Sequence, residues 1–234
     1  MCTVSWLRQD GGYHLLCNRD EKLTRREAWP PYVDRVDGLR TIAPRDGDFG
    51  GTWIGVNEAG VSICLLNGPA AKPGALAPAS RGSLVMDLLG CPSVQIAVRR
   101  IHGMALTRFA PFMVVALERR APAQVVEWRG DGALVCQTGD HLCPLVSSSF
   151  DPDGVKDTRR REYAQLTQAG IETSRLQEFH QSHGGSAGPH SPCMHRHDAK
   201  TVSFSWITVT SEAITFQYKP GSPCENKPCL YSFF

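Results

Sequence analysis

The sequence lacks any uninterrupted apolar run of the roughly 18 residues that a membrane-spanning helix requires. Its first residues also lack the basic segment followed by an apolar segment that marks a secretory signal. Neither sign of charge predominates, because the net charge is only +2. The densest basic cluster, at residues 159–161, is only three residues long. We therefore expect a cytoplasmic protein without a membrane span or a nucleic-acid partner. Nothing in the pattern fixes an oligomeric state.

Cysteine is not scarce, but its number is odd, with nine residues among 234. In a chain without a secretory signal, that number predicts reduced thiols in preference to disulfide bonds. Apolar residues make up 41% of the chain and charged residues 21%, which is ordinary for a globular protein and argues against disorder or a fibrous repeat. A chain of this length fits one domain, which we place at residues 2–234.

Apolar segments on either side of turn residues predict three β-hairpins. The paired segments are residues 2–7 with 13–17, 52–56 with 61–66, and 201–210 with 213–218. Further strands are expected at residues 113–117, 125–128 and 134–135. Strands therefore dominate both ends of the chain.

Helical spacing of apolar residues predicts two short helices on either side of Pro92, the second capped by Ser93, and a polar amphipathic helix at residues 155–167. Two segments without a period predict loops: residues 18–50, a long loop of the kind that serves a site, and residues 183–192, a flexible loop. Helices grouped between terminal strands predict a layered α+β fold.

Cys2 is a candidate nucleophile because of its position. It follows Met1, and its small side chain permits removal of that residue, so that a thiol and a free α-amino group would belong to one residue. Reference pKa values of about 8.5 for the thiol and about 7.7–8.0 for the amine leave part of the amine unprotonated near neutral pH, where it can act as a base. The sequence therefore predicts a nucleophile and its base in one place.

The first hairpin places residues 18–21, which read Asn-Arg-Asp-Glu, beside Cys2. One turn register puts Cys2 opposite Arg19, and the other puts it opposite Glu21. Directly opposed Cβ atoms lie about 4.5–5.5 Å apart, so we expect Arg19 to lower the pKa of the Cys2 thiol and Asp20 to orient its ammonium group. The competing interpretation is an ion pair at a strand end beside a buried, inert cysteine.

Three groups of residues carry a family resemblance. They are Cys2 with Asn-Arg-Asp-Glu at 18–21, Gly-Gly-Thr-Trp-Ile-Gly at 50–55, and Cys-Met-His-Arg at 193–196 with Asp198 and Thr-Val-Ser at 201–203. On these motifs the chain resembles the NRDE-motif family from residue 2 to about residue 225. That resemblance implies an N-terminal-nucleophile (Ntn) hydrolase fold, a four-layer αββα sandwich of antiparallel sheets in which the nucleophile opens a central strand.

The resemblance also implies roles for individual residues. In the bile acid hydrolase and penicillin V acylase branch of the Ntn superfamily, the catalytic group contains an N-terminal Cys, an Arg and an Asp on the next strand, and an oxyanion-binding Asn after a third strand. Cys2, Arg19, Asp20 and Asn67 resemble those positions. Candidate substrate contacts are Asn18, Ser148, Arg160 and Arg196. The adjacent Arg19 and Asp20 depart from the spacing of that branch, and residues 147–149 are serines where the branch has a second Asn.

Two other motifs resemble functional sites. Residues 184–188 match the Gly-x-Ser-x-Gly pattern of a nucleophilic serine, but the predicted loop around Ser186 lacks the strand before it and the helix after it. Cysteines and histidines recur at residues 193–197 and 224–229, with a spacing that fits zinc poorly. We therefore expect no metal and no cofactor, with His195 as a structural hydrogen-bonding residue. Trp53, Trp128 and Trp206 are expected in the core.

The resulting functional expectation is an N-terminal-cysteine hydrolase that cleaves a non-peptide amide bond of a small acylated molecule. The alternative, implied by the family resemblance, is a non-catalytic protein of the same fold in haem or lipid handling, or in Golgi organisation and secretion. A hydrolase that uses Ser186 is the third possibility. Substitution of Cys2 separates the first two, because a carrier would retain its ligand and an amidase would lose its activity.

Overall fold

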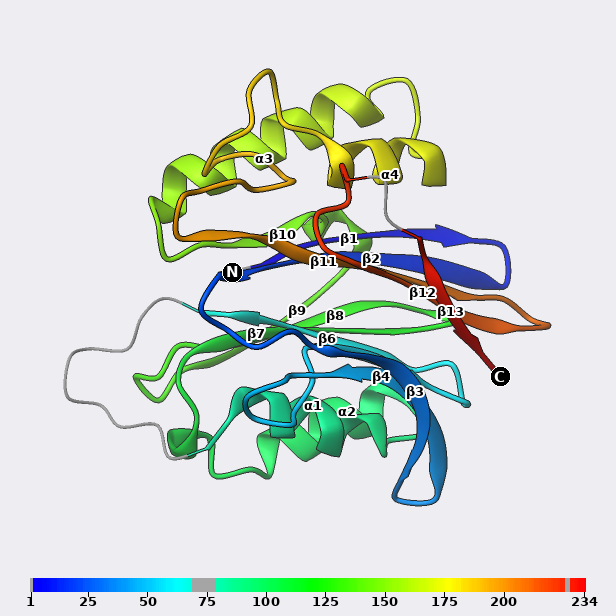
Figure 1. Ribbon diagram of the computed structural model, residues 1–234. Helices are drawn as coiled ribbons and strands as arrows, with labels where there is room; N and C mark the ends of the chain where they lie inside the picture. The colour runs from blue at the N-terminus through cyan, green and yellow to red at the C-terminus, as the bar shows by residue number, and fades with distance from the viewer. Residues whose placement is uncertain (1, 69–78, 226–227) are drawn as a thin grey trace.

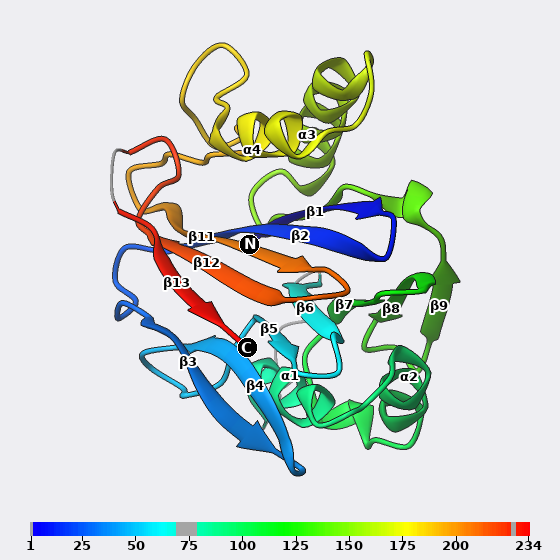
Figure 2. The same cartoon turned by 90° about the vertical axis from the view of Figure 1, so that its right-hand side faces the viewer.

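The computed structural model describes residues 2–68, 79–225 and 228–234. In these segments the strands form two antiparallel sheets that lie face to face, and helices cover the two outer faces (Figure 1, Figure 2). The layers therefore follow the order helix, sheet, sheet, helix, which confirms the expected αββα architecture. Among these described segments, none of the helices combines the length and apolarity that a bilayer crossing requires.

One sheet joins the first and the last predicted hairpins. Its strands, in spatial order, are β10 (Leu145–Ser147), β1 (Cys2–Gln9), β2 (Gly12–Lys22), β11 (Ala199–Val209), β12 (Ile214–Pro220) and β13 (Leu230–Phe233). The central pairing is that of β2 with β11, which brings the motif at residues 18–21 beside residues 199–204. Segments that are distant in the sequence thus become neighbours at this sheet.

The other sheet follows the order of the sequence. Its strands are β3 (Trp29–Val36), β4 (Leu39–Arg45), β5 (Ile54–Asn57), β6 (Ser62–Asn67), β7 (Phe112–Glu118), β8 (Ala121–Trp128) and β9 (Leu134–Thr138). Short 3₁₀ turns at Leu106–Arg108 and Asp140–Leu142 precede β7 and β10. The second predicted hairpin is confirmed, because β5 and β6 pair in antiparallel fashion.

Two pairs of helices complete the sandwich. α1 (Arg81–Leu89) and α2 (Val94–His102) lie on the sheet that contains β6, and α3 (Pro152–Thr167) and α4 (Thr173–Gln181) lie on the sheet that contains β1 (Figure 1). The predicted cap is confirmed, because the Ser93 hydroxyl accepts a hydrogen bond from the Ile96 N–H at 3.3 Å. Three clusters of buried apolar side chains fill the three spaces between the layers.

The expectation of one long loop over residues 18–50 is wrong. β2 continues to Lys22, and β3 and β4 form a further hairpin around Asp37 and Gly38, both of which have positive φ angles (48° and 86°). β3 lies at the edge of its sheet and is mostly exposed, so its residues have no apolar period. An edge strand needs only one buried face and tolerates proline, which makes it hard to recognise in a sequence.

Candidate active site

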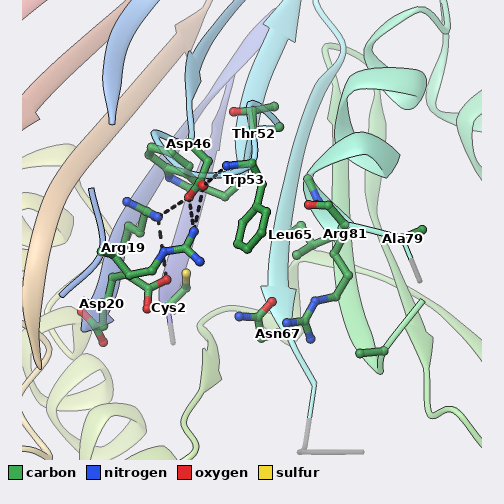
Figure 3. A pocket seen from close by; sticks show the side chains of 17 residues that line it. Cys2, Arg19, Asp20, Asp46, Thr52, Trp53, Leu65, Asn67, Ala79 and Arg81 are labelled. Atoms are coloured by element: carbon green, nitrogen blue, oxygen red, sulfur yellow. Dashed lines mark hydrogen bonds and ion pairs between the residues drawn. The ribbon is translucent and has the colours of Figure 1, made fainter. Parts of the chain in front are cut away.

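Cys2 is the first residue of β1 and lies between two neighbouring strands. It is opposite Arg19 of β2, so the first of the two predicted registers is confirmed, and opposite Ser147 of β10. Its backbone nitrogen donates a hydrogen bond to the Ser147 hydroxyl at 3.2 Å. The side chain is 6% exposed and lies on the wall of a cavity between the two sheets (Figure 3). Met1 lies outside the described residues.

The cavity has a volume of about 540 Å³ and is lined by the four predicted catalytic residues, although the Asp20 carboxylate is turned toward Arg159 of α3. Cys2, Arg19 and Asp20 come from the β1–β2 hairpin, and Asn67 comes from the end of β6 in the opposite sheet. Figure 3 shows Asn67 beside Arg81 on the wall that faces Cys2. The remaining wall is supplied by residues 46–53 and the start of α1. The β1–β2 hairpin and the end of β6 therefore line the same cavity.

The Arg19 guanidinium is held by groups other than the thiol. It forms a 2.6 Å ion pair with Asp46, which also binds Arg25 at 2.7 Å, and it stacks at 4.4 Å over the Trp53 ring (Figure 3). Burial alone would raise the pKa of Asp46, but the Phe49 N–H and the two arginines lower it below its usual value. Asp46 therefore stays ionised and fixes the direction of the Arg19 side chain.

The Cys2 thiol is not acidified in this arrangement. A hydrogen bond with the neighbouring Cys17 thiol, followed by burial, raises the pKa of Cys2 well above its usual value. The expectation that Arg19 would lower this pKa is therefore wrong. The physical reason is that the Arg19 charge is directed at Asp46 and Trp53, whereas Cys17 lies against the sulfur.

Asp20 belongs to the cavity and also reaches the helical layer above the sheet. Its carboxylate accepts hydrogen bonds from Arg159 of α3 at 3.0 Å and from the Thr201 hydroxyl of β11 at 2.7 Å. The Arg159 side chain is 1% exposed and also donates to the Thr3 hydroxyl. A charge-assisted network therefore ties β1, β2, β11 and α3 together beside Cys2.

None of the four predicted substrate contacts lines the described cavity. The Asn18 amide donates to the backbone carbonyls of His180 and Pro192, at 2.8 and 2.9 Å, on the helical side of the sheet. Ser148 bonds to the backbone of Phe150, and Arg196 pairs with Asp198 at 2.8 Å. Arg160 is exposed on α3, and the buried arginine there is its neighbour Arg159. A substrate role for these four residues therefore stays a prediction, and in the described chain none of them lines this cavity.

Four residues of the site were not predicted from the sequence as functional residues. Ser147, and not Ser148, contacts the Cys2 nitrogen, and Asp46 holds Arg19. Trp53 is buried as expected, but it also lines the cavity. Arg81 sits at the start of α1, donates to the Pro111 carbonyl at 2.9 Å and points into the cavity (Figure 3). The motif at residues 50–55 was a signal for Trp53, whereas Asp46 and Arg81 belong to no recognised pattern.

The competing serine site does not form. Ser186 is exposed in the loop that follows α4, so a helix precedes it where the nucleophile motif requires a strand, and no helix follows it within residues 183–198. The loop itself is internally bonded, because the buried Ser191 hydroxyl donates to the carbonyls of His183 and Ser186, both at 3.1 Å. Its flexibility stays a prediction.

Comparison with protein families identifies the family of this chain. A model of the family described as Transport and Golgi organisation 2 matches residues 1–169. The match includes Cys2 and the motifs at residues 18–21 and 50–55, and it confirms the family resemblance; the motif at residues 193–203 lies beyond the matched residues. None of the curated proteins matches the chain in sequence.

Solved structures share the fold at low sequence identity. A penicillin V acylase from Agrobacterium tumefaciens is 12% identical with a TM-score of 0.57, covering 99% of this chain and 85% of its own. A mutant conjugated bile acid hydrolase from Clostridium perfringens is 14% identical with a TM-score of 0.62, covering 99% and 92%. A Caenorhabditis elegans orthologue of N-acylethanolamine-hydrolyzing acid amidase is 13% identical with a TM-score of 0.58, covering 88% and 92%. At these identities the similarity establishes the Ntn-hydrolase fold.

Proposed function

Because the chain belongs to the Transport and Golgi organisation 2 family, whose model matches residues 1–169, we propose that it is an amidohydrolase with Cys2 as its nucleophile. Its substrate would be a small molecule with a non-peptide amide bond. The observation that carries the proposal is the meeting of Cys2, Arg19, Asp20 and Asn67 around one cavity of about 540 Å³. The names of the structural neighbours, which describe acylases, hydrolases and amidases, support an acyl amide as the substrate class.

The first step requires the free amino group of Cys2, after removal of Met1. This amine takes the thiol proton as the sulfur attacks the acyl carbon, which converts the carbonyl to a tetrahedral oxyanion. The amine is suited to the role because it belongs to the same residue as the sulfur. Ser147, which contacts the Cys2 nitrogen at 3.2 Å, would orient it.

The oxyanion would be bound by the Asn67 side-chain amide, which faces the cavity from the end of β6. Collapse of the intermediate breaks the C–N bond, and the ammonium of Cys2 returns its proton to the departing amine. Water then attacks the thioester and releases the carboxylic acid and the thiol. Loss of one oxyanion donor lowers kcat by about 10²–10³ in comparable sites, so Asn67→Ala should lower turnover by that amount.

The decisive experiment combines intact-protein mass spectrometry with labelling by a cysteine-reactive acyl probe. We expect the purified full chain to begin at Cys2 and to lose its labelling in Cys2→Ala. Cys136→Ala is the matched control, because Cys136 is exposed on β9 and does not line the cavity. Labelling of Cys2→Ala at the level of the wild type, or a mature chain that retains Met1, would refute the proposal.

A second candidate function is ligand binding without catalysis, in haem or lipid handling. The raised pKa of the Cys2 thiol favours it, since a protonated thiol is a poor nucleophile. Cys2→Ser separates the two functions. A carrier would bind haem or a fluorescent fatty acid as well in Cys2→Ser as in the wild type, and neither protein would hydrolyse acyl amides.

A further inference from the structure

A second group of reactive side chains gathers at the sheet that contains β11; none of its members lines the cavity, and all lie outside the family-matched residues. It consists of His183 from the loop after α4, Cys193 and His195 from the segment before β11, and Cys224 from the turn after β12. Their ligand atoms all lie within 4.8 Å of one another. Three segments that are separate in the sequence therefore direct two sulfurs and two imidazole nitrogens at one point.

Three of the six separations between ligand atoms, all measured from His195 Nε2, match those of a tetrahedral zinc site. The two Nε2 atoms of His183 and His195 are 3.3 Å apart, and His195 Nε2 is 3.5 Å from Cys193 Sγ and 3.4 Å from Cys224 Sγ. Zinc with Zn–N bonds of about 2.0–2.1 Å and Zn–S bonds of about 2.3 Å would separate two nitrogens by about 3.3 Å and a nitrogen from a sulfur by about 3.6 Å. The observed separations agree with both values.

Hydrogen bonding alone does not account for this convergence. One imidazole nitrogen carries either one proton or one lone pair, so it forms one good hydrogen bond along that direction. His195 Nε2 nevertheless has three neighbours within 3.5 Å, namely His183, Cys193 and Cys224. A cation at the centre satisfies all four groups at once, because each of them directs its own lone pair at the cation.

We propose that His183, Cys193, His195 and Cys224 form a structural binding site for one Zn²⁺ ion. Two thiolates and two imidazoles are a ligand set that zinc prefers, whereas Mg²⁺ and Ca²⁺ prefer oxygen ligands. The two thiol protons pass to solvent on binding, so the two thiolates balance the charge of the ion. Four protein ligands fill a tetrahedral shell, which leaves no position for a substrate and makes the role structural.

The site would fix three segments to one another near the cavity. Cys193 and His195 flank Met194, whose N–H donates to the Thr201 hydroxyl at 2.8 Å. That same hydroxyl donates to Asp20 at 2.7 Å. One backbone contact thus separates the metal ligands from the network that holds Asp20, and the ion would stabilise both the loop at residues 183–192 and this side of the cavity.

This proposal departs from our sequence-based expectation of no metal. That expectation relied on local spacing, and the ligands here do not form two local pairs. His183 reaches the site because the loop after α4 folds back on itself, and Cys224 reaches it because β12 lies beside β11. Only the antiparallel pairing of these strands brings the two thiols together.

Metal content of the untagged full chain tests the proposal directly. The protein is stripped with a chelator, reloaded with Zn²⁺ in the presence of a phosphine reductant and desalted, and its zinc is then measured by mass spectrometry. We expect close to one zinc per wild-type chain, and the same for Cys136→Ser, whose exposed thiol lies on β9. Loss of a ligand in Cys224→Ser should weaken binding by at least the roughly 10–100-fold that loss of an outer hydrogen-bond partner causes elsewhere.

Cys224 is exposed, so Cys224→Ser should fold, and circular dichroism checks that it does. Loading with Co²⁺ adds a second measurement, because tetrahedral cobalt with thiolate ligands absorbs visible light strongly. That absorption should appear in the wild type and in Cys136→Ser and weaken in Cys224→Ser. A folded wild type without stoichiometric metal, or equal metal in the two variants, would overturn the proposal. Neither outcome bears on Cys2, which does not belong to this site.

Discussion

The helical layer of α1 and α2 is attached to its sheet mainly by apolar side chains, whereas the layer of α3 and α4 also buries charged and polar ones. Leu84, Val85, Leu88 and Leu89 of α1 are fully buried. On the other side of the molecule, the buried residues of α3 and α4 include Arg159, Glu162 and His180 as well as a smaller apolar cluster. Both layers cover a sheet of similar size. Apolar burial holds the α1–α2 layer, whereas ion pairs and hydrogen bonds also hold the α3–α4 layer.

The difference follows from what each sheet presents to its helices. β2 turns Asn18 and Asp20 toward the α3–α4 layer, while Cys17 and Arg19 point into the space between the sheets. Polar groups on a sheet face must be bonded when a helix covers them. The α3–α4 layer therefore supplies the partners of the strand that carries the candidate catalytic residues, and its stability should depend on charge. We test this contrast with variants from each layer.

The largest effect is expected for Arg159→Met. It removes the ion pair that Asp20 makes with α3 inside the protein, and breaking such a buried pair typically costs about 3–5 kcal/mol of unfolding free energy. Arg160→Met is the matched control, because the adjacent side chain is exposed and should change stability by less than about 0.5 kcal/mol. Urea unfolding of both variants gives the two values. Equal stability of the two variants would contradict the claim that buried charged groups stabilise the α3–α4 layer.

A smaller loss is expected in the apolar layer, for Leu88→Ala. Leu88 is fully buried between α1 and its sheet, and truncation of such a leucine costs about 2–5 kcal/mol. No charged group is exchanged, so this loss should be the same at pH 7 and pH 5. Unfolding free energies of Leu88→Ala and the wild type at the two pH values test this, and a loss that varies with pH would contradict the assignment.

The local parts of this architecture were accessible from the sequence. The opening hairpin, the position of Cys2 opposite Arg19 and the Ser93 cap all depend on residues within about 20 positions of one another. α4 was missed because its buried face is small, with Leu176, Phe179 and His180 as its buried residues. Short elements of that kind have little periodicity to detect.

The burial of Arg159, beside the exposed Arg160, could have been predicted from the sequence. Val155 and Tyr163 are eight residues apart, so both lie on the buried face of α3, and position 159 falls midway on the same face. Asp46, in contrast, reaches Arg19 from a loop between β4 and β5, and no periodic pattern specifies that approach. A tertiary contact from a loop to a distant strand is therefore the part of the site that could not be predicted from the sequence.

A third test concerns pH and His180. Burial, followed by the charge of Arg159, lowers the pKa of His180 to about 3, whereas an unfolded histidine has a pKa of about 6.5. Between these values the unfolded chain binds one more proton than the native protein, so stability falls as the pH falls. From pH 7 to pH 5 this one group should remove about 2 kcal/mol of unfolding free energy.

His180→Gln should abolish that component, because glutamine does not titrate and can still bond to the Ser5 hydroxyl, which lies 2.8 Å from His180 Nε2. Denaturant unfolding between pH 7 and pH 5 measures the slope for the variant and the wild type. His141→Gln, at an exposed position, is the matched control. If the slope of His180→Gln equals that of the wild type, the buried histidine is not the source of acid sensitivity in the α3–α4 layer.

The smallest effect is expected for Ser93→Ala at the start of α2. The hydroxyl of Ser93 accepts one hydrogen bond from the Ile96 N–H, and loss of such a cap costs about 1 kcal/mol. Because α2 belongs to the apolar layer, distant from Cys2, the variant should keep the pH dependence of the wild type and its labelling by the acyl probe. A change in labelling after so small a loss of stability would mean that α2 influences the cavity through α1, whose first residues Arg81 and Gly82 line it.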